Sequence, residues 1–180
     1  YNQYQRKPTM LFFLPPLVKG LLSILGYTLN TIVLSVPLVI MSLLKILLPF
    51  HGFVVIIDRI LIGIATLWIS INSLNNRLFC RIEWDIRGLE QLKKEEWYLV
   101  ISNHQSWVDI LALQTVLNNR IPMLKFFLKK ELIWVPFLGL AWWALDFPFM
   151  KRYSKKTLEA KPHLKGKDIE STQKACKKFK

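Results

Sequence analysis

The sequence predicts an α/β domain preceded by a membrane-embedded helical hairpin. Residues 1–74 hold only one acid and five bases, whereas residues 75–180 hold 11 acids and 20 bases. Two long apolar runs occupy the first part, and short patterns typical of strands and helices alternate in the second, as in an α/β domain. We therefore divide the chain into an anchor (1–76) and a globular domain (77–180).

The first apolar run extends over residues 17–48. Lys19 and Lys45 enclose 25 uncharged residues within it. As a helix this segment would measure about 37 Å, more than the roughly 30 Å of a bilayer's hydrocarbon core. The run is too long for the apolar part of a signal peptide. Pro37 lies in its middle and should kink the helix, which membrane helices tolerate. We predict a membrane helix here.

A second apolar run, over about residues 53–74, follows a turn at residues 49–52. It holds Asp58 beside Arg59, two charges near its start that could pair or extend towards lipid headgroups. Cations precede the first run and follow the second, at Arg6, Lys7, Lys19, Arg77 and Arg81. The positive-inside rule therefore favours a hairpin with both ends in the cytoplasm. A second helix that lies in the membrane interface is the alternative.

The net charge of the chain is +13 at pH 7. Nucleic acid is a common partner of so basic a chain, but the sequence contains no nucleic-acid motif, and the apolar runs favour anionic lipid headgroups. Cys80 and Cys176 stand far apart and have neither the spacing of a disulfide framework nor that of a metal site. We expect membrane lipid as a partner, and neither nucleic acid nor a metal.

The second part of the chain mixes strand and helix patterns. Residues 79–86 alternate between apolar and polar, and residues 97–101 form a short apolar run rich in strand formers, which predicts a buried strand. Helices are expected over about 106–117, 125–132 and 169–179.

A segment with a histidine and an aspartate at short spacing directly follows the predicted buried strand: Ser102-Asn103-His104-Gln105-Ser106-Trp107-Val108-Asp109. On one continuous helix His104 and Asp109 would point about 140° apart, so His104 must lie in the loop before the helix and Asp109 in its first turn. The carboxylate can then hold one imidazole nitrogen and leave the other to take a proton. The competing interpretation is structural, because Ser106-x-x-Asp109 matches a capping box with Asp in place of Glu.

Asn103-His104-x-x-x-x-Asp109 resembles the first signature block of the glycerolipid acyltransferase superfamily, which includes the 1-acylglycerol-3-phosphate acyltransferases. Residues 135–141 and 147–152 are similar to its second block, with Met150 where the family has Ile. The residues between these segments, 142–146, are most similar to the branch of the lysocardiolipin acyltransferases and their bacterial inner-membrane relatives. The family's third and fourth blocks are not found, so we expect the chain to end before them, within the catalytic domain.

The resemblance implies a mixed sheet flanked by helices. It also implies an O-acyltransferase that moves a fatty acyl group to a free hydroxyl of a lysophospholipid such as 1-acylglycerol-3-phosphate, in phospholipid synthesis or remodelling. His104 would be the general base and Asp109 its orienting partner, while Arg152, Lys151 and Phe149 would bind the acceptor.

No cofactor is implied by the resemblance, because acyl-CoA or acyl carrier protein is a co-substrate. The resemblance places the enzyme in the bacterial inner membrane with its catalytic domain on the cytoplasmic side. A membrane-anchored scaffold without activity, and acyl transfer to a different acceptor, are the alternatives.

Overall fold

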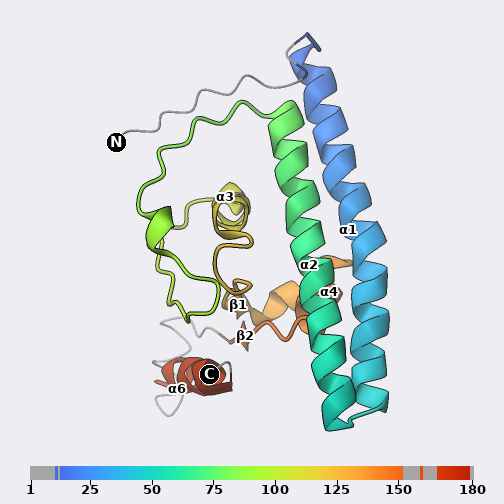
Figure 1. Ribbon diagram of the computed structural model, residues 1–180, viewed down its shortest axis with the longest axis vertical. Coiled ribbons are helices and arrows are strands. Elements are labelled where there is room, and N and C mark those ends of the chain that lie inside the picture. The colour runs from blue at the N-terminus through green and yellow to red at the C-terminus, as the bar shows by residue number, and fades with distance from the viewer. Residues whose placement is uncertain (1–10, 12, 152–158, 160–165, 179–180) are drawn as a thin grey trace.

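The computed structural model describes residues 11, 13–151, 159 and 166–178. Two long helices, α1 (Pro16–Leu47) and α2 (His51–Phe79), form an antiparallel hairpin, and a smaller domain packs along it (Figure 1). Both helices are long and apolar enough to cross a membrane. They match the two predicted apolar helices, and α1 continues through Pro37.

Polar residues predominate among the buried side chains of α1, and large apolar side chains are exposed on both helices. Asn30 donates from Nδ2 to the Trp68 carbonyl oxygen (3.0 Å) and to Asn72 Oδ1 (2.7 Å). Four of the five buried residues of α1 are polar: Ser23, Asn30, Ser35 and Ser42. Large apolar side chains are exposed along both helices instead. Helices in lipid pack in this way, because lipid is as apolar as leucine and polar or small residues hold the helix interface.

Helix α2 extends past its predicted end at Leu74, because its last turn bonds to α1. Asn75 donates from Nδ2 to both the carbonyl oxygen (3.0 Å) and Oγ (3.1 Å) of Ser23. The Tyr27 hydroxyl donates to Asn76 Oδ1 at 2.6 Å. These polar residues carry no apolar periodicity, so the sequence pattern gave no sign that the helix continues.

The smaller domain contains the helices α3 (Trp107–Leu117), α4 (Leu138–Ala144) and α6 (Lys167–Lys178). Two short 3-10 helices, η1 (Leu89–Gln91) and η2 (Lys130–Trp134), accompany them. The strands β1 (Leu128–Lys129) and β2 (Phe149–Met150) pair in parallel, with Leu128 opposite Phe149.

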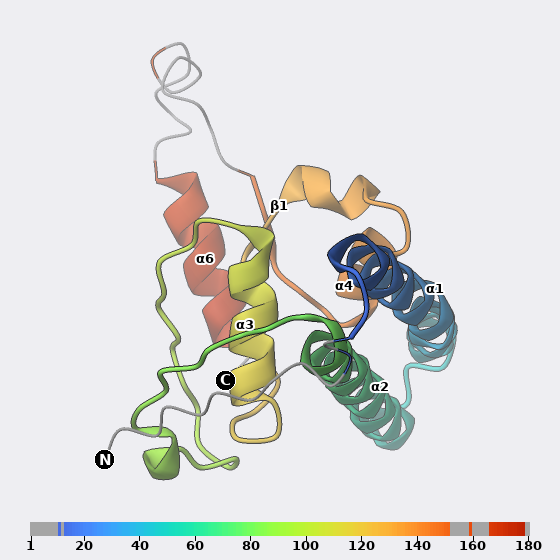
Figure 2. The same ribbon diagram turned by 90° about the horizontal axis from the view of Figure 1, so that it is seen from above.

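A hydrophobic core joins the hairpin to the domain. It includes Leu38 of α1, Leu61 of α2 and Ala141 of α4, all of which are almost completely buried. Helix α4 packs on α1, and α3 packs on α2. The view along the hairpin shows the domain on one side of the helix pair (Figure 2). The domain is therefore packed against the side of the hairpin and does not hang from one end.

The predicted strand over residues 97–101 is not observed. This segment is extended but belongs to no sheet in the described part of the chain, and Leu99 and Ile101 are 79% and 86% exposed. A run of strand formers becomes a buried strand only where another segment supplies its hydrogen bonds and covers its faces. The predicted helices over 106–117 and 169–179 are confirmed as α3 and α6.

Two further segments differ from their predictions. The expected strand over residues 79–86 is not formed. Phe79 is the last residue of α2, and Trp84 makes only an isolated bridge. Residues 125–132 do not form the predicted helix: 125–127 lie in no element, and 128–132 form β1 and the start of η2. The Leu128 N–H donates to the Pro148 carbonyl oxygen (3.0 Å) and holds the segment alongside β2. The fold is thus mostly helical with a small parallel sheet, and a larger flanked sheet stays a prediction.

Candidate active site

The candidate site lies at the start of α3. Residues 101–105 form an exposed loop, and the helix begins after Ser106, its N-cap. Ser106 Oγ accepts the Val108 N–H (3.2 Å), and the Asp109 carboxylate accepts the Ser106 N–H (2.8 Å), which completes a capping box. These bonds satisfy N–H groups that a helix start leaves without partners. The structural interpretation of Asp109 is therefore confirmed.

The same carboxylate also faces His104. Asp109 Oδ2 lies 3.4 Å from His104 Nδ1 and accepts the Gln105 N–H at 2.6 Å. The loop thus folds around one carboxylate oxygen, with His104 before the helix and Asp109 in its first turn, as the spacing predicts. Because Nδ1 faces the carboxylate, Nε2 is the ring nitrogen suited to accept a proton. Asp109 therefore both caps α3 and orients the imidazole of His104.

The backbone around Asp109 favours its ionised form. Hydrogen bonds from the N–H groups of Ser106 and Gln105 lower the pKa of the Asp109 carboxyl from its ordinary value, and the neighbouring His104 acts in the same direction. The N-terminus of a helix also favours negative charge. A carboxylate that stays ionised at neutral pH can stabilise the imidazolium that forms when His104 takes a proton.

Two tryptophans connect the site to α4. Trp107, the first residue of α3, stacks on Trp142 of α4, with ring centroids 6.4 Å apart and planes inclined by 10°. Such stacking holds the start of α3 against α4. Sequence reasoning missed this contact. The only signals were an aromatic residue directly after the cap and a Trp pair after the Pro-Phe-Leu-Gly turn.

The start of α4 is a tight turn within the second family-like segment. The Leu138 N–H donates to the Pro136 carbonyl oxygen at 2.7 Å, and Phe137 has φ 61° and ψ −49°, the geometry of a rare γ-turn. A Cβ on Gly139 would overlap the Ile133 carbonyl oxygen, so a larger residue has no room there. This close contact fixes α4, and with it Trp142, against η2.

The other predicted site residues lie at β2. Phe149 is half-buried and packs against the core, and Lys151 follows the strand and is exposed. Arg152 lies outside the described residues. The structure therefore brings His104 and Asp109 together and places Phe149 and Lys151 on a different element, so their roles in binding stay predictions. Within the described ranges, no three His, Cys, Asp or Glu residues are grouped to hold a metal ion.

The region around His104 is similar to known proteins. A family model described as Acyltransferase matches residues 83–174, just over half of the chain. The 1-acyl-sn-glycerol-3-phosphate acyltransferases alpha of Mus musculus and Homo sapiens are each 36% identical over 80 residues, which are 44% of this chain and 26% of theirs.

A gamma form from Pongo abelii is 29% identical and covers 59% of this chain and 36% of its own length. The chain thus spans about a quarter of the length of the alpha relatives that it matches. No solved structure matches the chain.

Proposed function

The chain belongs to the Acyltransferase family, and on this premise we propose that it is part of a membrane-bound enzyme that acylates a lysophospholipid. The acyl group would come from acyl-CoA or acyl carrier protein and would pass to a free hydroxyl of an acceptor such as 1-acylglycerol-3-phosphate. The names of the relatives support this acceptor. The observation that carries the proposal is the pair of exposed His104 and half-buried Asp109, with 3.4 Å between their facing atoms, inside the matched region.

In the proposed reaction His104 is the general base. Its Nε2 takes the proton of the acceptor hydroxyl while the hydroxyl oxygen attacks the carbonyl carbon of the thioester. The carbon–sulfur bond then breaks, and the proton passes from the imidazolium to the leaving thiolate. Asp109 holds the ring and stabilises its cationic form. Since Asp109 already accepts the Gln105 and Ser106 N–H groups, donors to the developing oxyanion come from elsewhere in the enzyme.

We assign the phosphate of the acceptor to Arg152, with Lys151 and Phe149 beside it. A guanidinium donates two parallel hydrogen bonds to a phosphate, which suits a headgroup site. The exposed position of Lys151 at the end of β2 supports this assignment. In the assay described below, Arg152→Ala is expected to raise the acceptor KM far more than the donor KM, and equal effects on both would count against the role.

The proposed location is the bacterial inner membrane, with the catalytic domain on the cytoplasmic side. Two apolar helices of membrane-crossing length support a membrane location. Arg77 in the last turn of α2 and Arg81 just after the helix support the cytoplasmic side, because cations near membrane segments are retained there.

The test is transfer of labelled acyl groups from acyl-CoA and acyl carrier protein to a panel of lysophospholipids by the full-length protein in vesicles. His104→Ala is expected to lower kcat by about 10²-fold or more, since it removes the base. His51→Ala, at the exposed start of α2, is the matched control and should keep wild-type activity. Transfer that survives in His104→Ala would show that the base is wrong, and absence of transfer by the wild type would overturn the function.

A further inference from the structure

The segment that carries His104 and Asp109 is bonded internally. Residues 101–108 are exposed. In the described part of the chain, every side-chain hydrogen bond of residues 101–109 stays inside that segment, and so does the contact of His104 with Asp109. The loop and the first turn of α3 therefore form one unit. This unit takes its position from whatever holds the start of α3.

Helix α3 is held to the hairpin at its other end. The hydroxyl oxygens of Ser73 and Thr115 are in hydrogen-bond contact at 3.0 Å, and Asn118 donates from Nδ2 to Ser70 Oγ at 3.0 Å. Thr115 is eight residues after Trp107, about 12 Å along a helix. A tilt of about 5° around this held end would therefore move the start of α3 by about 1 Å.

The start of α3 is held by the stack of Trp107 on Trp142. The two ring centroids are 6.4 Å apart, and the planes are inclined by 10°. Among the described residues, no other ring contact, side-chain hydrogen bond or ion pair joins residues 101–109 to an element outside α3. The stack is therefore the specific contact that resists a tilt of α3.

The other partner of the stack lies on an element that is itself fixed. Ala141 and Ala144 of α4 are each 2% exposed and belong to the same core as Leu38 of α1 and Leu61 of α2. A close-packed core of this kind leaves an element little freedom to shift. The Trp142 ring therefore projects from a helix that is packed against the hairpin.

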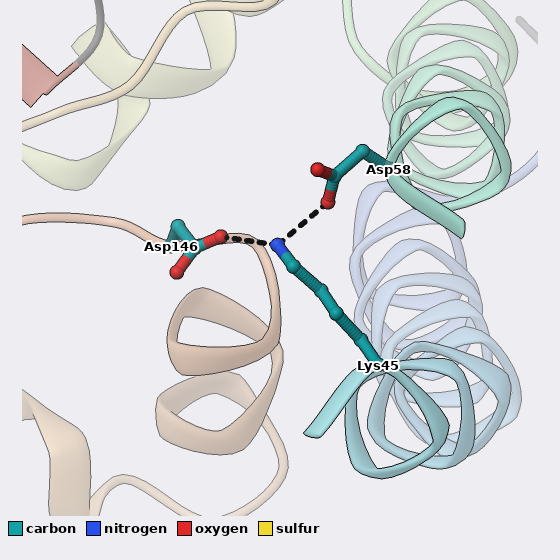
Figure 3. A network of polar contacts seen from close by, with 3 residues as sticks. All are labelled: Lys45, Asp58 and Asp146. Carbon is teal, nitrogen blue, oxygen red and sulfur yellow. Dashed lines mark hydrogen bonds and ion pairs between the residues drawn. The ribbon is translucent and has the colours of Figure 1, made fainter. Parts of the chain in front are cut away.

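An ionic contact holds the end of α4 in the same place. Asp146, which follows α4, accepts a hydrogen bond from Lys45 Nζ at 2.9 Å, and Lys45 also donates to Asp58 Oδ1 at 2.6 Å (Figure 3). Lys45 belongs to α1 and Asp58 to α2. Only 22% of the Lys45 side chain is exposed. One partly buried cation thus joins both hairpin helices to the residue that follows α4.

We propose that Trp142 is a positioning residue for the general base: through its stack on Trp107 it sets where the His104–Asp109 pair lies in relation to the rest of the enzyme. It acts through Trp107 and α3, and not on the reacting atoms. The inference rests on the proposed function, in which His104 must meet a hydroxyl held elsewhere in the enzyme. A displacement of about 1 Å is enough to lower a rate by about 10²-fold.

The first test is the steady-state kinetics of acyl transfer by the full-length protein in vesicles. Trp142→Ala is expected to lower kcat by about 10-fold or more and to leave the KM of donor and acceptor within about twofold, because the base is displaced and the binding groups are not. Trp142→Phe keeps a ring that can stack and should recover most of the loss. Trp142→Leu keeps apolar bulk without a ring and should behave like Trp142→Ala, so the test does not depend on the folding of one variant.

The matched control is Trp143→Ala. Trp143 is the next residue on α4, is 37% exposed and makes no ring contact among the described residues, so its removal should leave kcat unchanged. Trp107→Ala completes a double-mutant cycle, in which the double variant should have a kcat no lower than that of the weaker single variant. Multiplicative losses in the cycle, equal losses in Trp142→Ala and Trp143→Ala, or a loss confined to KM would each overturn the proposal.

A second measurement needs no turnover. Spin labels are attached at Gln105→Cys in the loop and His51→Cys at the start of α2, with Cys80 and Cys176 replaced by Ser, and the distance between them is measured by pulsed electron paramagnetic resonance. Trp142→Ala should shift or broaden the distribution of distances, and Trp143→Ala should not. An unchanged distribution in Trp142→Ala would overturn the proposal. Absence of acyl transfer by the wild type would overturn the proposed function instead, so the two failures are distinguishable.

Discussion

At the scale of the residue, Asp109 serves the fold and the candidate site through one oxygen atom. Its Oδ2 accepts the Gln105 and Ser106 N–H groups and faces His104 Nδ1. The geometry of the cap therefore sets the position of the imidazole. A change that keeps the cap and removes the charge would separate the two roles, and asparagine offers that change.

We predict that Asp109→Asn keeps α3 folded and lowers kcat by about 10²-fold or more. The amide oxygen can still accept the backbone N–H groups, whereas a neutral amide stabilises an imidazolium poorly. The measurements are acyl transfer and the unfolding midpoint in detergent, with Asp109→Ala as the variant that loses both roles. An Asn variant with nearly wild-type turnover would show that Asp109 is only a helix cap.

The pH dependence of stability gives a second readout of the same substitution. Because folding lowers the pKa of the Asp109 carboxyl, its stabilising contribution is complete above the unfolded pKa of about 4 and is lost as the pH falls through the folded pKa. The unfolding midpoints of wild type and Asp109→Asn are therefore expected to differ near neutral pH and to converge in acid.

The sequence was informative about this site because its geometry is local. His104 and Asp109 are five residues apart, so helix periodicity and the capping pattern predict their placement without knowledge of the rest of the fold. The stacking of Trp107 on Trp142 joins residues 35 positions apart. No periodicity connects them, and only the packing of α4 against α1 and α3 against α2 brings them together.

At the scale of the element, α4 depends on the turn that precedes it. Gly139 lies against the Ile133 carbonyl oxygen, and Phe137 has a positive φ that most residues avoid. The family-like segment is therefore a structural requirement for the position of Trp142. Its connection to the candidate site is the stacking of Trp142 on Trp107.

We predict that Gly139→Ala destabilises the protein by about 1–3 kcal/mol, because its Cβ would overlap a backbone atom that cannot rotate away. Gly63→Ala in α2 is the matched control. Nothing lies within 4 Å of a Cβ at that position, so the change should be neutral or stabilise by up to about 1 kcal/mol. Chemical unfolding in detergent measures both. Equal effects of the two substitutions would show that the close contact at Gly139 is not present.

Element predictions succeeded where a segment is determined by its own pattern. The apolar runs identified α1 and most of α2. The end of α2 depends on Asn75 and Asn76 bonding to α1, and apolar periodicity cannot reveal such bonds. The prediction for residues 97–101 was wrong for a different reason. Their strand-forming residues indicate a strand, but no segment in the described part of the chain pairs with them. Pairing between distant segments is the information that a local pattern lacks.

At the scale of the whole molecule, the packing of the domain on the hairpin is the feature that the sequence least reveals. The sequence allows Asp58 to pair with Arg59 or to reach headgroups, and the structure pairs it with Lys45. Asp146 comes from a segment 101 positions away from Lys45 and joins the same cation. Its backbone has a positive φ of 56°, which Asp tolerates better than most residues. The carboxylate thus occupies a helix-ending position that glycine usually holds.

We predict that Lys45 and Asp146 are energetically coupled across the hairpin and the domain. In a double-mutant cycle of Lys45→Met and Asp146→Asn, the coupling energy from unfolding in detergent should be about 1–2 kcal/mol. The exposed pair Lys93–Glu96, with 70% and 50% of its side chains exposed, is the matched control and should give about 0.5 kcal/mol or less. The difference follows from burial, because water and salt screen the surface pair more strongly than the partly buried one. A coupling no larger than that of the control would mean that the domain does not dock on the hairpin through Lys45.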